Sequence, residues 1–510
     1  MTKSCILLDR LYVPVEYVSE AALDEFTYEL KADHPDEENP FEVVKGYIKT
    51  YVRVRNADGS EYYGFARGNI PKIGRLFGDL PWIDKTAVPP MKTKLTFNGT
   101  LRTWDAHKIS QQEAADEWFT KRFGVLRASP RFGKTITSIY LITKLGLKTL
   151  IVTHQKDLLE QYHNSLLKFT DIEQQRDALL EYHHGKVNTR KKRDARGQIC
   201  GYFQDYDNPE ELDVCLLCWQ TFASAAYGSE RLLKYKTTWG FNIVDEVHRG
   251  NSNVYAKVIN NLAPRYRLGL TGTVERSDHR EFIIKDIIGP VVAEGRTETI
   301  PCTVTIIPTE VEIKYKFPEP MPWLHKRIYK GKGRMETVLK WLLKDVEAGY
   351  SICFAFHSGS TPQLIQWRDH LRLHGVKAEA FWGKCPNRDE VLNMARSGEI
   401  SVLVCNRSML TGIDIPRWNC FYNAFPTSNV VFDEQGRLSG NYYQEFSRVR
   451  TPFVYEDGTL KSEAFIRDFI DKNGYCYGSL NKRKSAYENQ KFKIVNIKSI
   501  TSPKKDNFWD

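Results

Sequence analysis

The sequence predicts an α/β protein with two tandem domains, each a parallel sheet with helices on both faces, preceded by a small α/β domain. Apolar runs of strand length alternate with stretches of helical period from about residue 101, and the strand-like runs end in polar residues. A second alternation of the same kind begins near residue 299. We therefore expect domains at residues 1–100, 101–298 and 299–510, with ligands at the carboxyl ends of the strands.

Composition narrows the class of protein. The chain has 510 residues and a formal net charge of +10, which suggests a polyanionic partner but is a weak signal alone. No apolar run approaches the length of a membrane span, so we expect no membrane partner and a cytoplasmic location, the host cytoplasm if the protein is viral. We expect Cys215 and Cys218, the one CxxC pair, to be buried strand residues rather than zinc ligands.

The first hundred residues contain a hairpin signal and a basic helix. Two strand-like runs are joined through Asp58-Gly59, a favoured hairpin turn. The helix that follows places Lys72 and Arg75 three residues apart, near Arg67. A grip on duplex or junction DNA and a solvated face of an accessory domain are equally good interpretations of these cations.

The first of the two larger domains opens with a helix and a phosphate loop. Ser110 and Glu113 have the spacing of a capping box. Further on, a strand at residues 123–128 leads through a loop into a helix beginning at Lys134. Such a loop presents backbone N–H groups and the positive end of the helix to a polyphosphate. The residues expected to contact ATP are Ser129, Pro130, Arg131, Phe132, Gly133, Lys134 and Thr135.

Within this loop Lys134 is expected to reach the β and γ phosphates, and Thr135 to bind Mg²⁺. The usual signature has glycine where this sequence has Ala128, and often also where it has Arg131. A chance match to the loop pattern is the alternative, and the carboxylates downstream make it much the weaker one.

Two carboxylates, Asp245 and Glu246, end the apolar strand GFNIVDE about 110 residues after the loop. Beside a triphosphate, Asp245 is expected to hold Mg²⁺ and Glu246 to orient or deprotonate the attacking water. An acidic pair at a strand end is otherwise a common turn or helix start. The phosphate loop makes the catalytic interpretation much the stronger one.

The second alternation, from residue 299, has no phosphate loop. It contains the run NYYQEFSRVR, which reads as a helix carrying Gln444, Arg448 and Arg450. An arginine here is expected to contact the γ-phosphate as an arginine finger, which is worth on the order of 10³ to 10⁵ in rate.

In this order the motifs resemble those of superfamily 2 helicases and translocases over residues 101–455. SPRFGKT resembles motif I, IVTHQ motif Ia, LLCWQTF motif Ic, DEVH motif II, TGT motif III, LTGIDIP motif V and QEFSRVR motif VI. GLTGTVERSD and DEVHR are similar to the branch with XPB-type enzymes, type I restriction motors and UvsW-type phage helicases, and the small first domain makes the UvsW type the nearest match.

The resemblance implies two RecA-like domains with ATP and Mg²⁺ between them and a single DNA strand across both. It implies that Gln111 reads adenine and that Gly412 and Asp414 contact ATP. It further implies coupling of hydrolysis to movement by His248, Thr271, Thr273 and Gln444, and contacts to the DNA strand by Gln155, Gln220, Thr221 and Thr411. Ser447 replaces a usual glycine and Arg450 comes one residue early, so Arg448 is the preferred finger.

A basic run interrupts the first large domain at residues 186–196. It is expected to contact DNA phosphates through Arg190, Lys191, Lys192 and Arg193, although charge runs are more often solvated loops.

The expected function is that of an ATP-dependent DNA helicase or translocase acting on branched DNA, by fork remodelling, branch migration or unwinding, in replication, recombination or repair. Three alternatives stand beside it: a DEAD-box RNA helicase, whose PTREL-like and Ser-Ala-Thr motifs are missing; the motor subunit of a restriction system; and a binding protein with a vestigial ATPase fold.

Overall fold

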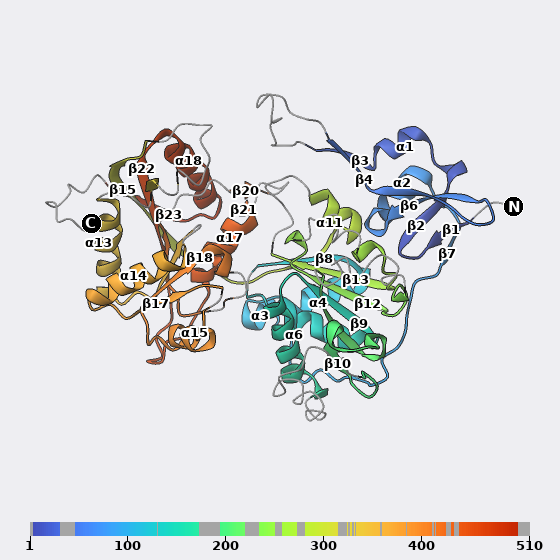
Figure 1. The fold of residues 1–510 in the computed structure, drawn as a ribbon, viewed down its shortest axis with the longest axis horizontal. Helices are drawn as coiled ribbons and strands as arrows, with labels where there is room; N and C mark the ends of the chain where they lie inside the picture. Colours follow the sequence, from blue (N-terminus) through green and yellow to red (C-terminus); the bar gives the residue numbers. More distant parts are fainter. Residues whose placement is uncertain are drawn as a thin grey trace. The chain divides into compact units, whose positions relative to one another are not determined.

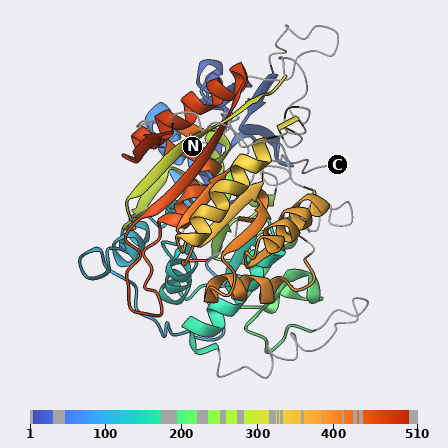
Figure 2. The same ribbon diagram turned by 90° about the vertical axis from the view of Figure 1, so that its left-hand side faces the viewer.

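The structure is a computed structural model (Figures 1 and 2). It describes residues 4–30, 46–129, 131–172, 194–219, 234–249, 258–272, 281–314, 324, 327–328, 331, 333–356, 360–383, 385–410, 413, 415–424, 430–432 and 438–497. The chain divides into two compact units, Met1–Thr297 and Glu298–Asp510. The first unit contains both the small domain and the first of the large domains.

The small domain is a mixed sheet with the strand order β5-β6-β2-β1-β7. The Asp58-Gly59 hairpin is confirmed, because β5 and β6 pair antiparallel with Arg55 opposite Glu61, and Gly59 takes φ +82°. The elements are β1 (Cys5–Leu7), β2 (Arg10–Pro14), α1 (Glu20–Asp24), β3 (Thr27–Leu30), β4 (Gly46–Lys49), β5 (Tyr51–Arg55), β6 (Glu61–Ala66), α2 (Ile70–Phe77) and β7 (Trp82–Asp84).

Arg67, predicted as part of a basic grip, is instead buried between this domain and the first parallel sheet. It is 2% exposed, donates hydrogen bonds to the carbonyl oxygens of Pro264 and Arg265, and lies 4.9 Å from the centre of the Phe123 ring. A Cβ at Gly68 would come within 1.9 Å of the Lys285 carbonyl oxygen. Only glycine therefore permits this close approach, and the small domain is firmly docked on its neighbour.

The first parallel sheet has the order β10-β11-β9-β12-β13-β8-β14, with all neighbours parallel. Three of its inner strands, β9, β11 and β12, are buried throughout, as expected of a sheet covered on both faces. The strands are β8 (Phe123–Ala128), β9 (Thr149–Thr153), β10 (Cys200–Tyr202), β11 (Val214–Cys218), β12 (Phe241–Asp245), β13 (Tyr266–Thr271) and β14 (Val291–Gly295). Cys215 and Cys218 are buried in β11, as predicted.

Helices cover both faces of this sheet. Along β9, Ile151 faces one cluster with side chains of α4, α5 and α6, whereas Leu150 and Val152 face another with α11. The helices are α3 (Trp104–His107), α4 (Gln111–Lys121), α5 (Lys134–Leu145), α6 (Lys156–Phe169) and α11 (Glu281–Ile287).

The capping box predicted at the start of α4 is wrong, although Ser110 does precede the helix. The Ser110 hydroxyl accepts a hydrogen bond from the Arg296 amide at 2.8 Å, and Glu113 accepts one from the Trp104 amide at 2.9 Å. Both side chains thus tie distant segments to the helix start, because those amides compete for the oxygens that a capping box would use.

The second unit is built on another seven-stranded parallel sheet, in the order β17-β18-β16-β19-β22-β15-β23. The strands are β15 (Cys302–Glu312), β16 (Ile352–Phe356), β17 (Ala378–Phe381), β18 (Val402–Asn406), β19 (Cys420–Asn423), β22 (Ala464–Lys472) and β23 (Lys493–Asn496), with a hairpin of β20 (Val431–Phe432) and β21 (Leu438–Ser439). The helices are α13 (Arg334–Glu347), α14 (Thr361–Leu373), α15 (Arg388–Ser397), α16 (Arg407–Leu410), α17 (Gly440–Ser447) and α18 (Gly474–Asn489). The predicted pair of helix-covered parallel sheets is confirmed.

Among the described residues, no helix has the length and apolar character needed to cross a membrane.

Candidate active site

The phosphate loop joins β8 to α5 at the carboxyl edge of the first sheet. Gly133 precedes α5 with φ +91°, and a Cβ there would lie 2.2 Å from Nε2 of Gln111. Arg131 also takes a positive φ, +68°, which explains why its position is often glycine. Two loop positions, Arg131 and Gly133, therefore take the left-handed backbone conformation just before α5.

Gln111 fixes this loop from the side. Its Nε2 donates to the Phe132 carbonyl oxygen at 2.6 Å, and its Oε1 accepts from the Arg102 amide at 3.0 Å. The side chain is 5% exposed. Both ends of the amide are used within the chain in this structure, so Gln111 acts as a brace for the loop, whatever part it takes in reading adenine.

Lys134 and Thr135 begin helix α5. The Lys134 ammonium group donates to the Ala128 carbonyl oxygen at 3.1 Å, so its side chain spans the loop. Because the first turn of a helix leaves N–H groups without intrahelical partners, its start favours an anion. This arrangement suits the phosphates of a nucleotide.

Asp245 ends β12 and Glu246 follows it at φ +48°, with the Glu246 amide donating to Asp245 Oδ1 at 2.9 Å. Burial raises the pKa of Asp245 to about 7, the charge of Glu246 adds to this rise, and the charge of Lys134 opposes it. Lys134 is therefore close enough to act on Asp245. The carboxylate is short of positive charge, which Mg²⁺ would supply, so Asp245 and Thr135 fit that ion.

Tyr162, on α6, is a site residue that sequence reasoning missed. Its side chain is 1% exposed, and its hydroxyl accepts a hydrogen bond from the Ser138 hydroxyl at 3.4 Å. Burial and the charge of Asp245 raise the pKa of this phenol well above its ordinary value, so the phenol stays protonated, and Tyr162 in turn opposes the rise in the pKa of Asp245. A tyrosine at an apolar position of a helix gives no signal that separates this role from simple packing.

His248 connects the carboxylates to the next strand. Its Nδ1 lies 2.9 Å from Thr271 Oγ1, at the end of β13, and 3.2 Å from Glu246 Oε2. The ring is buried at 6% exposed. The structure thus brings together His248 and Thr271, two of the residues predicted to couple hydrolysis to movement. His248 also contacts Glu246, the predicted base.

In the second unit the two predicted arginines differ. Arg448 is half-buried and donates to the Ile413 carbonyl oxygen. Arg450 is 8% exposed, donates to Thr299 Oγ1 at 2.7 Å and to Gln490 Oε1 at 3.2 Å, and lies 4.7 Å from the centre of the Phe492 ring. These contacts give Arg450 a structural role in its own unit and favour Arg448 as the finger.

The predicted DNA-contacting residues are only partly described. Gln155 precedes α6 as its N-cap, and Arg75 is exposed on α2. Lys72 donates to the Glu25 carbonyl oxygen and forms an ion pair with the Glu25 carboxylate at 3.5 Å, so it is already engaged. Outside the described residues lie Pro130, Arg190, Lys191, Lys192, Arg193, Gln220, Thr221, Thr273, Thr411, Gly412, Asp414 and the side chain of Gln444.

Residues 107–276 match the family model described as type III restriction enzyme, res subunit. The putative DNA 3'-5' helicase Rad25 of Haloarcula marismortui is 23% identical over 360 residues, which cover 66% of this chain and 52% of the relative. The probable helicase D10 of Escherichia phage T5 is 21% identical over 382 residues, 73% of each chain. The crystal structure of T4 UvsW aligns over 97% of this chain and 100% of that chain, at 13% identity and a TM-score of 0.36.

The chain spans about half the length of the Rad25-type relatives from the two haloarchaea, 52% and 47%. A DNA 3'-5' helicase XPB from Kineococcus radiotolerans is 26% identical over 316 residues. These matches confirm the predicted resemblance: the chain is similar to DNA helicases of the XPB and Rad25 type.

Proposed function

We propose that this chain is an ATP-driven DNA helicase or translocase that acts on branched DNA. The observation that carries the proposal is the cluster of Lys134, Asp245 and Glu246 at the carboxyl edge of one sheet, with the charge of Lys134 acting on Asp245. The names of the relatives, which include DNA 3'-5' helicases and translocases, support DNA as the track.

ATP and Mg²⁺ are the proposed ligands of this cluster. When bound, the nucleotide supplies the phosphoanhydride bond whose hydrolysis releases free energy. Lys134 binds the β and γ phosphates, while Thr135 and Asp245 hold the metal ion. Glu246 orients the attacking water and accepts its proton, and the Tyr162 hydroxyl keeps Asp245 in place.

His248 is the proposed link between hydrolysis and movement. Because its Nδ1 contacts both Glu246 and Thr271, a change at the carboxylate is passed directly to the end of β13. Arg448, in the short 3-10 helix Arg448–Arg450, is the proposed arginine finger of the second unit, and Gln444 lies on the preceding helix α17. The contacts proposed for the DNA strand come from Gln155 and from the motif residues that lie outside the described parts of the chain.

The test is DNA-stimulated phosphate release by the full chain. Lys134→Ala or Glu246→Gln should lower the rate by roughly 10² or more, because each removes a group that acts on the developing charge or on the water. Lys144→Ala, an exposed lysine at the end of the same helix, is the matched control and should leave the rate unchanged. Full activity in either site variant would refute the proposal.

The finer part of the proposal, action on branched DNA, needs a separate measurement. Stimulation by single-stranded DNA, duplex, a fork and a four-way junction should be compared at equal nucleotide concentration and fixed salt. We expect the fork or the junction to stimulate most. Equal stimulation by all four would reject branched-DNA specificity, and stronger stimulation by RNA of equal length would reject DNA as the track.

A further inference from the structure

A second pocket lies along the seam between the small domain and the first parallel sheet, within the first unit. It has a volume of about 440 Å³, in the size range of roughly 300 to 1,000 Å³ typical of ligand sites. We call it the seam pocket. Its walls come from β2, β4, β5 and α11, and its main polar and aromatic lining residues are Asp9, Arg10, Lys49, Tyr51, Asn260 and Asn261.

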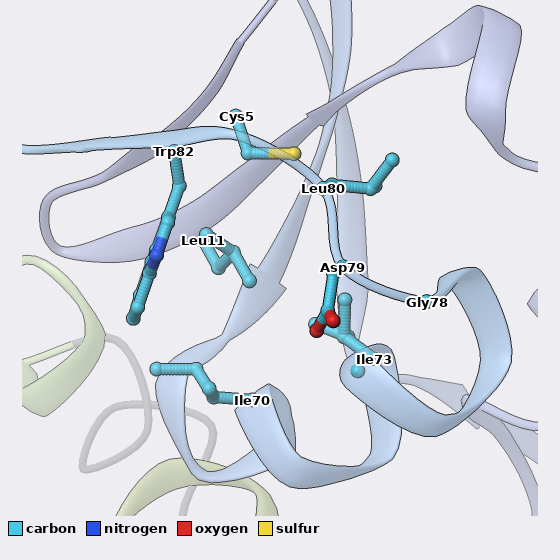
Figure 3. A pocket seen from close by; sticks show the side chains of 9 residues that line it. Cys5, Leu11, Ile70, Ile73, Gly78, Asp79, Leu80 and Trp82 are labelled. Atoms are coloured by element: carbon cyan, nitrogen blue, oxygen red, sulfur yellow. The ribbon is translucent and has the colours of Figure 1, made fainter.

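The small domain has another cavity, which makes a useful contrast. Figure 3 shows it with Trp82 on one side and Asp79 and Ile73 on the other. It measures about 170 Å³, and no lysine or arginine lines it. The seam pocket is both larger and cationic, so the two differ in the kind of ligand they suit.

Two cations of the seam pocket lack a carboxylate partner. Among the described residues, Arg10 and Lys49 make no ion pair with an acidic side chain, whereas Lys236 neutralises Asp9 at 2.7 Å. Burial lowers the pKa of Arg10, while the charge of Asp9 raises it, and the guanidinium stays protonated at neutral pH. A half-buried guanidinium of this kind is an open site for an anion, above all a phosphate.

Asn260 adds a second, independent signal. It is 6% exposed and lines the pocket, and its Oδ1 is buried without a hydrogen-bond partner among the described residues. Leaving such a buried oxygen without a donor is unfavourable unless a ligand bonds it. The missing partner is a donor such as a base amino group or a sugar hydroxyl.

Apolar and aromatic walls complete the site. Ile283 and Ile287 of α11 line the cavity together with Val52 and Tyr51 of β5. A flat apolar ring therefore has surfaces to pack on, next to an amide for its edge and cations for an attached anion. These are the parts of one nucleotide: base, sugar and phosphate.

We propose that the seam pocket binds one phosphate-bearing nucleotide unit, with Arg10 and Lys49 on the phosphate and Asn260 on the base or sugar. The unit is either a free nucleoside monophosphate or a nucleotide of an unpaired DNA strand. The pocket goes beyond the proposed ATPase, and only the strand-borne form of the ligand rests on that function.

The experiment measures binding of 5'-dAMP and of a short fluorescent oligodeoxynucleotide to the full chain carrying Lys134→Ala, which weakens the motor site. Arg10→Met removes the charge but keeps the packing of the stem, and should weaken binding roughly tenfold to a hundredfold. Asn260→Ala tests the second contact. Trp82→Ala is the matched control, because it changes the other cavity of the same domain.

Loss of 5'-dAMP binding on Arg10→Met identifies a free nucleotide as the ligand, and loss seen only with the oligonucleotide identifies a strand. Equal binding by the Arg10→Met and parent chains for both probes overturns the proposal. Melting curves separate a folding defect from lost binding, and Lys49→Met, at an exposed position, repeats the test without a buried change. DNA-independent ATPase of Arg10→Met in the otherwise natural chain should be unchanged, so this proposal and the ATPase can fail separately.

Discussion

The buried charges of strand β22 in the second unit and those around the ligand site of the first unit have different partners. The inner strand β22 alternates its charged side chains between the two faces of the sheet. Arg467 pairs with Asp345 and Asp471 with Arg334, both on α13, while Asp468 on the other face pairs with Arg483 of α18. Each of these three buried charges of β22 has a partner of opposite sign, so charge here serves the fold.

In the first unit two buried arginines have acceptors of another kind. Arg67 and Arg267 donate to carbonyl oxygens rather than to carboxylates. Among the described residues, no lysine or arginine forms an ion pair with Asp245, which is 9% exposed. Buried charge without a counter-charge is expensive unless a ligand completes it. The comparison teaches that the first unit is the one built to receive ligands, and its variants should respond differently from those of the second unit.

The largest effect should come from Asp468→Ala in the second unit. Its carboxylate accepts from Arg483 Nε at 2.8 Å, the Tyr487 hydroxyl at 2.8 Å and Asn423 Nδ2 at 2.9 Å. Removing it leaves the Arg483 charge uncompensated, and the free energy of unfolding should fall by about 3 to 5 kcal/mol. Urea unfolding measures the loss, and hydrogen exchange at β22 locates it.

The paired variant Asp468→Leu with Arg483→Met is the control for that experiment. Replacing both charges by apolar groups should recover much of the lost stability, because no buried charge is left alone. If the double variant were no more stable than Asp468→Ala, cavity formation rather than the unpaired charge would explain the loss.

A smaller effect is expected from Arg67→Met at the docking seam of the first unit. The substitution removes the hydrogen bonds to two carbonyl oxygens and the contact with Phe123, and should cost about 2 to 3 kcal/mol. Limited proteolysis should then release the small domain faster than from the natural chain. Arg75→Met, at an exposed arginine of the same domain, should not change the rate.

Asp245→Asn should raise the stability of the folded chain at neutral pH rather than lower it. The reason is that burial raises the pKa of the natural carboxylate from 3.8 to about 7. The folded chain then binds the proton more tightly than the unfolded chain, so stability falls as pH rises from about 4 to about 7. In the nucleotide-free variant this fall should be absent, and above pH 7 the variant should be more stable by roughly 1 to 3 kcal/mol. Melting temperature against pH checks it, and parallel curves for both chains would contradict it.

Much of this first unit could be predicted from the sequence, because local patterns carry both fold and chemistry: a strand and loop lead into the helix that begins at Lys134, and two apolar strands end in Asp245 and Thr271. What could not be predicted depends on tertiary contacts. Arg67 reads as an exposed cation, yet it is buried by a neighbour some 200 residues away. The sequence suggests that Tyr162 is an ordinary core residue, yet its hydroxyl opposes the rise in the pKa of Asp245.

The seam pocket could not be predicted from the sequence for the same reason. Arg10 and Asn260 are about 250 residues apart, and only the docking of the small domain brings them to one cavity. No spacing rule joins residues across such a distance. The second unit shows the converse, since the alternation of charges along β22 is visible in the sequence but its partners on α13 and α18 are not.

The smallest effect should come from the surface pair Arg53 and Glu61, which sets the lower limit of the comparison. Their side chains lie 2.5 Å apart on β5 and β6, and the arginine side chain is 60% exposed. The Arg53 guanidinium lowers the pKa of Glu61. The ion pair therefore stabilises the fold only above the ordinary carboxyl pKa, and this stabilisation is lost as pH falls. Water and salt screen that contribution, so Glu61→Gln should leave the urea midpoint unchanged. A shift like that of Asp468→Ala would mean that exposure does not separate structural charge pairs from incidental ones in this chain, and the contrast between the two units would lose its physical basis.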